Sequence, residues 1–199
     1  MFQTAPGCSI PHLNQIREEY EVRERHSLLA NVSFPNLAPL VTEFYRSLPE
    51  PLFFVMHLPL SQQEERQLCY PPDRHYQEVL YLDHQTRAQI DAIMDSYGPL
   101  LLADGISQFA IASHTSNQEI FVQKFKIVSI FAPQPRDFIP LVERYGLRQV
   151  PRVTTAWDTI SRSSAAECTR ISYEGMDAYM VAEALKKQGM YRSSVEPSD

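Results

Sequence analysis

Three stretches of the chain place apolar residues at the spacing of one helix face, and each is followed by a glycine. The i, i+3, i+4, i+7 pattern occurs in residues 90–97, 138–145 and 176–185. The glycines that follow are Gly98, Gly146 and Gly189. A glycine just past a helix adopts the left-handed conformation at low cost. The pattern therefore predicts three helices that end at these positions.

Apolar runs of strand length flank the first two of these helices. They cover residues 78–83, 106–113, 119–131 and 150–157. The polar stretch 114–118 (HTSNQ) has the length of a hairpin connection. Residues 78–158 therefore predict the order βαββαβ, which is that of a ferredoxin-like split βαβ unit. The two helices share the same apolar spacing, which would fit a repeated unit. The alternative is that they resemble each other only because all amphipathic helices share this spacing.

The longest apolar run, residues 119–131, is expected to form one strand in the middle of the sheet. Both of its faces are apolar near the ends, which is typical of a strand covered on both sides. Lys124 and Lys126 interrupt the run. We expect their stems to lie along apolar surface or their ends to point past a sheet edge.

The rest of the chain has similar patterns. The mixed charges of residues 13–29 predict a surface helix. The other expected elements are a helix over residues 36–48, a buried strand over 52–58, a short helix opened by a capping box at 61–64, a strand over 168–173 and a frayed tail over 193–199.

A Pro-Pro pair at residues 71–72 marks the best candidate for an internal boundary, near residues 70–77. It would separate an N-terminal α/β piece, residues 1–70, from a C-terminal α+β unit, residues 77–199. Neither part has a long flexible linker, so we expect one co-folded domain over residues 1–199. The predicted fold class is α+β. One mixed or antiparallel sheet carries the packed helices, and the N-terminal piece extends the βαββαβ unit.

Composition and charge exclude several classes of protein. The 199 residues are 44% hydrophobic and 21% charged, unlike a disordered chain. The net charge of -6 is opposite to the balance typical of nucleic-acid binders. The most apolar run, residues 51–60, is shorter than the roughly 20 residues that cross a bilayer. We therefore expect a soluble protein that binds neither nucleic acid nor membrane.

The cysteines and histidines give no sign of a metal or disulfide framework. Cys8, Cys69 and Cys168 are odd in number and have no CxxC spacing. The six histidines lack HxH, HxxxH and HExxH spacing, and the few glycines form no phosphate-binding loop. These patterns favour a reduced, cytoplasmic protein without metal or cofactor. Cys168 alternates with its neighbours as a strand residue does, which favours a buried structural thiol.

The acidic residues are concentrated in residues 78–104, where five of them accompany a single arginine. Asp91 and Asp95 share one stripe of a predicted helix. This stripe is either an ordinary solvated helix face or an acidic patch that docks a basic partner. The second interpretation predicts a non-enzymatic protein-binding module, such as an inhibitor of the immunity-protein type. Its expected contact residues are Asp91, Asp95, Asp104, Trp157 and Asp158.

The alternative function is a small-molecule-binding protein or a hydrolase-like enzyme with a pocket against the sheet. Its residues would be His114, Trp157, Asp158 and Cys168, with His114 as the acid/base and with Asp158 and Cys168 beside it. Convergence of these side chains in one pocket would favour the enzyme, and their dispersal would favour the binding module. A homodimer joined along an exposed sheet edge is a third possibility.

Overall fold

A computed structural model of the chain describes residues 1–23, 26–68, 71, 74–161 and 163–198. Cys69 and most of the Pro-Pro break lie outside the described residues. The protein is an α+β protein built on one large open sheet, with a small two-stranded sheet beside it.

The large sheet has the strand order β11-β5-β4-β6-β7-β8-β3-β2-β9 within the described residues. Its strands are β2 (Glu19–Arg23), β3 (Ser27–Asn31), β4 (Leu52–Pro59), β5 (Tyr76–Gln85), β6 (Gln108–Ser113), β7 (Gln118–Val122), β8 (Ile127–Phe131), β9 (Arg148–Gln149) and β11 (Tyr191–Pro197). Neighbouring strands are antiparallel except for the parallel pair β2 and β9. Strands from either side of residues 70–77 thus interleave in one sheet.

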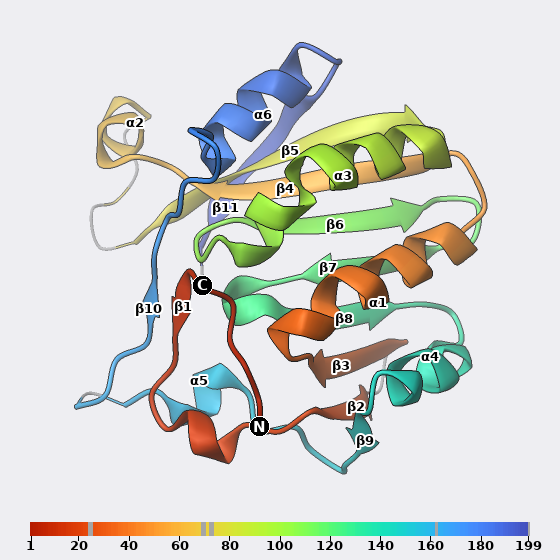
Figure 1. Ribbon diagram of the computed structural model, residues 1–199. Coiled ribbons are helices and arrows are strands. Elements are labelled where there is room, and N and C mark those ends of the chain that lie inside the picture. The colour runs from red at the N-terminus through yellow and green to blue at the C-terminus, as the bar shows by residue number, and fades with distance from the viewer. Residues whose placement is uncertain (24–25, 69–70, 72–73, 162, 199) are drawn as a thin grey trace.

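Four main helices lie on one face of this sheet (Figure 1). They are α1 (Phe34–Ser47), α3 (Arg87–Ala103), α4 (Ile139–Arg144) and α6 (Ala178–Lys186). Because strand side chains alternate between faces, Phe54 and Met56 of β4 join the main core under these helices, whereas Phe53 and Val55 point to the opposite face. The main core therefore lies between the helices and the sheet.

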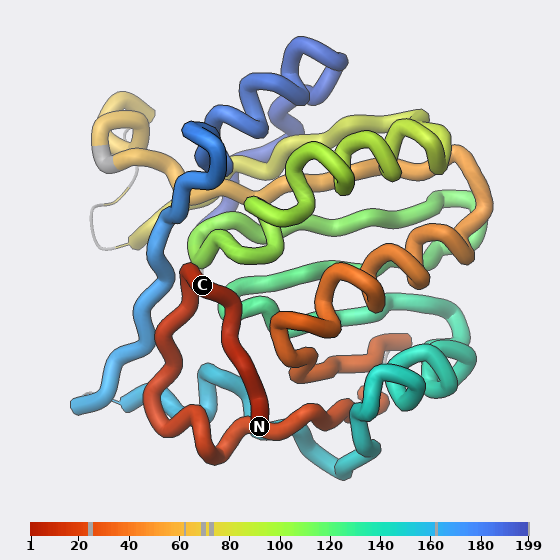
Figure 2. The backbone as a smooth tube through the Cα atoms, in the orientation of Figure 1, coloured from red at the N-terminus to blue at the C-terminus, as the bar shows by residue number. Residues whose placement is uncertain are grey.

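A smaller core closes one end of the large sheet. There β1 (Cys8–Ser9) pairs with β10 (Glu167–Cys168), and Figure 2 shows these two distant parts of the chain running side by side. The short helices η1 (Leu13–Gln15) and α5 (Ala156–Thr159) lie nearby. The two remaining 3₁₀ turns are η2 (Lys124–Lys126) and η3 (Pro135–Phe138), and α2 (Gln62–Gln67) lies at the side.

Several predicted elements are confirmed. The helix over 36–48 is α1, the strand over 52–58 is β4, and Ser61 and Glu64 form the expected capping box. The polar stretch 114–118 joins the β6–β7 hairpin. Gly146 and Gly189 follow α4 and α6 with φ of 83° and 107°, as expected of helix-terminating glycines.

The helix predicted over residues 13–29 is wrong, because this segment forms β2 and β3 after η1. Its charged residues alternate with apolar ones at the strand period of two. Tyr20 points into the main core, and Glu21, the next residue, accepts a hydrogen bond from Val153 on the opposite side.

The single strand predicted over 119–131 is also wrong. The chain turns back at η2, where Phe125 and Lys126 have φ of 57° and 58°. The run is thus a second hairpin, β7–β8.

The helix predicted to end at Gly98 continues through Gly98 and Pro99 to Ala103. The expected strand over 150–157 contains no strand and ends in α5, and the strand over 168–173 is reduced to β10. The tail predicted to be frayed is the edge strand β11, paired with β5.

The ferredoxin-like strand order predicted over residues 78–158 is wrong. β4, which lies outside this range, is inserted between β5 and β6 and is antiparallel to both. The unit β5–α3–β6 is therefore a split βαβ, as predicted. The strand between its two parallel strands is β4, which precedes the unit in the sequence. β8 adds a strand that the predicted order lacks, and β9 lies at the far edge of the sheet.

Candidate functional site

The sheet face opposite the four main helices is called here the open face. Its centre is a small apolar cluster of Phe53, Val55, Val79, Ala110 and Ala112, against which Tyr81 and Phe121 pack. Each of these residues comes from β4, β5, β6 or β7 and follows the period-two alternation of its strand.

Aromatic rings form a continuous row over part of the open face. The Phe53 ring lies 4.2 Å from the His114 ring and 6.0 Å from the Tyr81 ring, measured between centroids. The Tyr81 ring lies 6.4 Å from that of Tyr191 on the edge strand. Tyr191 and Phe131 are 49% and 40% exposed, so large apolar side chains meet solvent here. Exposed aromatic side chains are typical of binding surfaces.

Glu119 lies among these rings without a described counter-charge. It stands in β7 directly opposite Ala112 of β6 and Phe131 of β8. Burial raises the pKa of its carboxyl group, and no ion pair of Glu119 is found within the described part of the chain. Burial and the nearby charges of Glu119, Glu196 and Asp83 also raise the pKa of Tyr81. The open face therefore carries an acidic, partly desolvated region.

A groove of about 530 Å³ lies at the other end of the open face. It is lined by His57, Gln77, Gln108, Phe121, Gln123, Lys124, Trp157, Glu196 and Pro197. Cavities of this volume hold small molecules or single side chains of a partner.

A chain of hydrogen bonds fixes the orientation of the polar groups that line the groove. The backbone N–H of Lys124 donates to Gln108 Oε1 (3.0 Å), so the Gln108 amide nitrogen donates to Gln77 Oε1 (3.1 Å). The Gln77 amide nitrogen then donates to His57 Nδ1 (3.1 Å). Since a backbone N–H can only donate, His57 must carry its proton on Nε2. Burial lowers the pKa of His57, which favours this neutral form.

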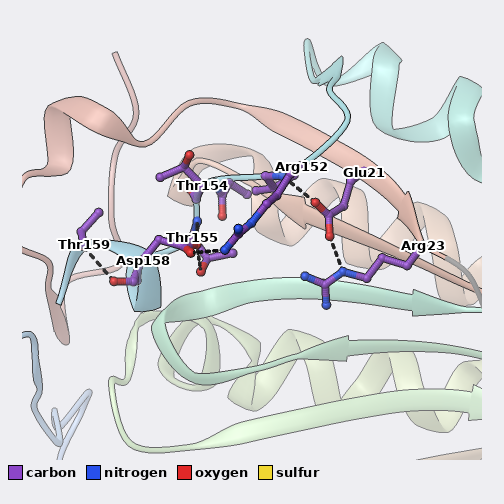
Figure 3. Close-up of polar contacts among 10 residues, drawn as sticks. Glu21, Arg23, Arg152, Thr154, Thr155, Asp158 and Thr159 are labelled. Atoms are coloured by element: carbon purple, nitrogen blue, oxygen red, sulfur yellow. Dashed lines mark hydrogen bonds and ion pairs between the residues drawn. The ribbon is translucent and has the colours of Figure 1, made fainter.

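Trp157 forms one wall of the groove and is 46% exposed. Its ring meets the Phe125 ring edge to face at 4.9 Å, and Lys124 Nζ lies 5.7 Å from its centroid. Asp158 holds the first turn of α5 by accepting hydrogen bonds from the backbone N–H and hydroxyl of Thr155, at 2.8 and 2.9 Å (Figure 3). The Thr155 backbone N–H lowers the pKa of Asp158, and Arg152 pairs with the carboxylate at 2.8 Å. Asp158 therefore positions Trp157.

The proposed catalytic residues His114, Asp158 and Cys168 do not converge. His114 lies in the β6–β7 hairpin, stacked on Phe53. Cys168 packs against the smaller core that contains Phe125, at the β7–β8 turn. The two turns are at opposite ends of β7, whose five residues span about 17 Å. The structure therefore forms no Cys–His pair from these residues.

The three acidic contact residues predicted outside α5 have different environments in the structure. Asp91 accepts hydrogen bonds from the Tyr45 hydroxyl (2.6 Å) and from Arg46 (3.0 Å), and the Tyr45 hydroxyl lowers its pKa. Asp95 is exposed on α3. Asp104, expected at the surface, is fully buried, which excludes it from any exposed acidic patch.

Asp104 is buried because its carboxylate satisfies the backbone where α3 ends. It accepts hydrogen bonds from the N–H groups of Ile106 (3.1 Å), Ser107 (2.7 Å) and Ile171 (3.0 Å). These bonds tie the C-terminal end of α3 to the segment after β10. Asp104 is therefore a structural residue.

Sequence reasoning missed Glu119, His57 and the glutamines of the groove. Gln77 and Gln108 lie near the start of β5 and β6. As polar residues within an alternating strand pattern, they could have been recognised from the sequence. The neighbours that desolvate Glu119 belong to β6 and β8, and their positions could be assigned only with the correct sheet order.

Within the described residues no group of three or more His, Cys, Asp or Glu side chains is placed to hold a metal ion. No helix in the same residues has both the length and the apolar character needed to cross a membrane. Comparison of the chain with protein-family models, with curated proteins and with solved structures finds no match.

Proposed function

We propose that this protein is a binding module that docks a basic protein partner on the open face of its sheet. The observation that carries the proposal is the environment of Glu119. Its carboxyl group is largely removed from water, and within the described residues it forms no ion pair. Charged groups that leave water are normally paired. A lysine or arginine of a partner would supply the missing charge.

The surroundings of Glu119 support a protein partner. Phe131, its direct neighbour across the β7–β8 pair, is 40% exposed. Tyr191 and Trp157 are also exposed at the two ends of this face. Aromatic anchors around a desolvated charge are typical of the residues that carry binding energy. The net charge of -6 would speed the encounter with a basic protein.

We therefore propose the acidic docking surface on the open face instead of on α3. Asp91 is already paired with Arg46 and Asp104 is buried, so neither offers a free charge. Trp157 stays in the proposed contact set, with Asp158 as its support. A module that covers part of a basic protein in this way would act as an inhibitor of the immunity-protein type.

The test uses matched baits in a lysate of the native host. Wild-type protein, Glu119→Gln and Phe131→Ser are compared with Asp95→Asn, which removes an exposed charge on the helix side. Wild type and Asp95→Asn should retain the same basic protein, identified by quantitative mass spectrometry. The two open-face variants should lose it, with an affinity about tenfold weaker or more for the purified pair. Equal retention by all four baits, or loss with Asp95→Asn alone, would overturn the proposal.

A second candidate function rests on the groove. His57, whose Nε2–H is fixed by the hydrogen-bond chain, lines a cavity large enough for a small ligand. Donors of this kind suit a ligand rich in hydrogen-bond acceptors, such as a carboxylate. Trp157 is the only tryptophan of the chain, so its fluorescence reports on the groove directly. A panel of small carboxylates should change this fluorescence saturably, and less so in Gln77→Ala. An unchanged signal across the panel would reject this function.

A further inference from the structure

Cys8 and Cys168 face each other across the small two-stranded sheet, although 160 positions separate them in the sequence. They are direct partners in the antiparallel register of β1 and β10. The Thr169 N–H donates to the Gly7 carbonyl (2.8 Å), so the next pair inward, Cys8 and Cys168, is of the non-hydrogen-bonded type. In such a pair the Cα atoms are about 4.5 Å apart and the side chains are close. A disulfide accepts this separation.

The two thiols are chemically different. Cys8 is buried and Cys168 is partly exposed. The hydrogen bond from the Cys8 thiol is the main cause that lowers the pKa of Cys168 to about 7, and Lys124, Lys126 and the Phe125 backbone N–H act in the same direction. The same hydrogen bond, together with burial, raises the pKa of Cys8. Cys168 is therefore the thiolate, and Cys8 stays a neutral thiol.

A buried cation is fixed beside this pair. Lys126 is 3% exposed, and its Nζ donates to the carbonyls of Leu101 and Ser107, both at 2.9 Å. Burial lowers the pKa of its ammonium group to about 8, while Cys8, Asp104 and Cys168 act to raise it. Asp104 raises the pKa of Cys8, whereas Lys126 lowers the pKa of both thiols. The ammonium group thus stabilises negative charge at the dithiol.

We propose that Cys8 and Cys168 form a redox-active dithiol that hydroperoxides convert into an intramolecular disulfide. The accessible Cys168 thiolate attacks one peroxide oxygen, the O–O bond breaks, and the leaving hydroxide takes a proton to become water. Cys168 is then a sulfenic acid. The Cys8 thiol attacks its sulfur, the S–S bond forms, the S–O bond breaks, and the Cys8 proton leaves with that oxygen as water. Two thiols are oxidised, and one hydrogen peroxide is reduced to two waters.

We expect the oxidation state of the two thiols to affect the surroundings of Trp157 in the groove. Cys168 packs against the smaller core that contains Phe125, and the Phe125 ring contacts Trp157. Forming the disulfide removes the negative charge of the Cys168 thiolate and ties its sulfur to Cys8. Oxidation should therefore change the fluorescence of Trp157. This inference does not depend on the proposed partner, because the oxidation of the two thiols needs no second protein.

The experiment uses the full chain with Cys69→Ser, so that no third thiol competes. The folded protein is treated with a small excess of hydrogen peroxide and analysed by intact mass and peptide mapping. We expect the loss of two hydrogen atoms, a Cys8–Cys168 crosslinked peptide and a higher melting temperature. Recovery of a fully reduced protein, of sulfinic acid at Cys168 without the crosslink, or of an intermolecular dimer would overturn the proposal.

Two further variants separate the roles of the thiols. In the same background, Cys8→Ser should stop at a sulfenic acid on Cys168 that dimedone traps, and Cys168→Ser should leave Cys8 reduced. The opposite pattern would overturn the assigned order of attack. Circular dichroism checks that each variant folds. If one does not fold, the crosslink in the parent protein still decides the proposal.

Discussion

Glu119 lies directly opposite Phe131 in the antiparallel β7–β8 pair, so a desolvated carboxyl group and an exposed aromatic ring share one place on the open face. A hydrophobic ring beside a carboxylate strengthens its interaction with an arriving cation, because it excludes water from the contact. Without a partner, the unpaired and partly buried carboxylate lowers the free energy of unfolding of the isolated protein. Glu119 therefore offers a test that needs no partner.

Replacing Glu119 by Gln should stabilise the isolated protein at neutral pH. Burial raises the folded-state pKa of Glu119, so the folded protein holds more protons than the unfolded chain between the ordinary and the raised pKa. The free energy of unfolding therefore falls as pH rises through this interval. Urea denaturation of wild type and Glu119→Gln at several pH values measures the difference, which should grow with pH and then level off.

Glu183→Gln is the control for this measurement. Glu183 is exposed on α6, and the hydrogen bond from Lys186 lowers its pKa. Glu183 therefore contributes to the free energy of unfolding with the opposite pH dependence. Its stabilising contribution is lost as pH falls through the lowered pKa. A difference between wild type and Glu119→Gln that does not vary with pH would contradict the burial of an unpaired carboxyl group.

Replacing Asp104 by Ala should destabilise the protein strongly. The substitution leaves three backbone N–H groups, those of Ile106, Ser107 and Ile171, without their acceptor. Buried donors that lose a partner cost about 1–3 kcal/mol each, so we expect a loss of roughly 3 kcal/mol or more. Asp95→Ala, at an exposed site, should change the free energy of unfolding by less than about 0.5 kcal/mol. Similar values for both variants would argue against the buried role of Asp104.

The reactivity of Cys168 should follow a titration near neutral pH. Its alkylation by iodoacetamide is expected to rise with a midpoint of about 7, the value set by the Cys8 hydrogen bond and the neighbouring lysines. Cys8→Ala removes the largest of these causes, so the midpoint should move upward. Mass spectrometry of labelled peptides gives the rate at each cysteine. An unchanged midpoint in Cys8→Ala would show that the two thiols do not interact.

The sequence predicted helices better than strands because the helical patterns are local. The apolar face of α1 and the capping box at Ser61 are complete within a few residues. The β7–β8 turn gave no such signal. Phe125 and Lys126 adopt positive φ although neither is a residue that favours it. Phe125 packs in the smaller core and Lys126 is held by two carbonyl groups, so tertiary contacts determine this turn.

The candidate sites were hidden for a related reason. Cys8 and Cys168 come together only because β1 and β10 pair, which no local pattern of the chain indicates. Asp104 was included in the predicted contact set because it belongs to the acidic stretch 78–104, whereas one of its actual partners, Ile171, lies far away in the sequence. Trp157 is exposed, and its surroundings depend on Phe125 and Lys124 from another part of the chain.

The final prediction concerns the protonation of His57. The hydrogen-bond chain that begins at the Lys124 backbone N–H requires His57 Nδ1 to accept and Nε2 to carry the proton. Nitrogen-15 NMR of the imidazole should therefore show the Nε2–H tautomer, and the ring should stay neutral below the ordinary pKa of histidine because burial lowers its pKa. In Gln77→Ala the donor to Nδ1 is absent, and both tautomers should be populated. A dominant Nδ1–H form in wild type would contradict the direction of the whole chain of hydrogen bonds and, with it, the donor character of the groove.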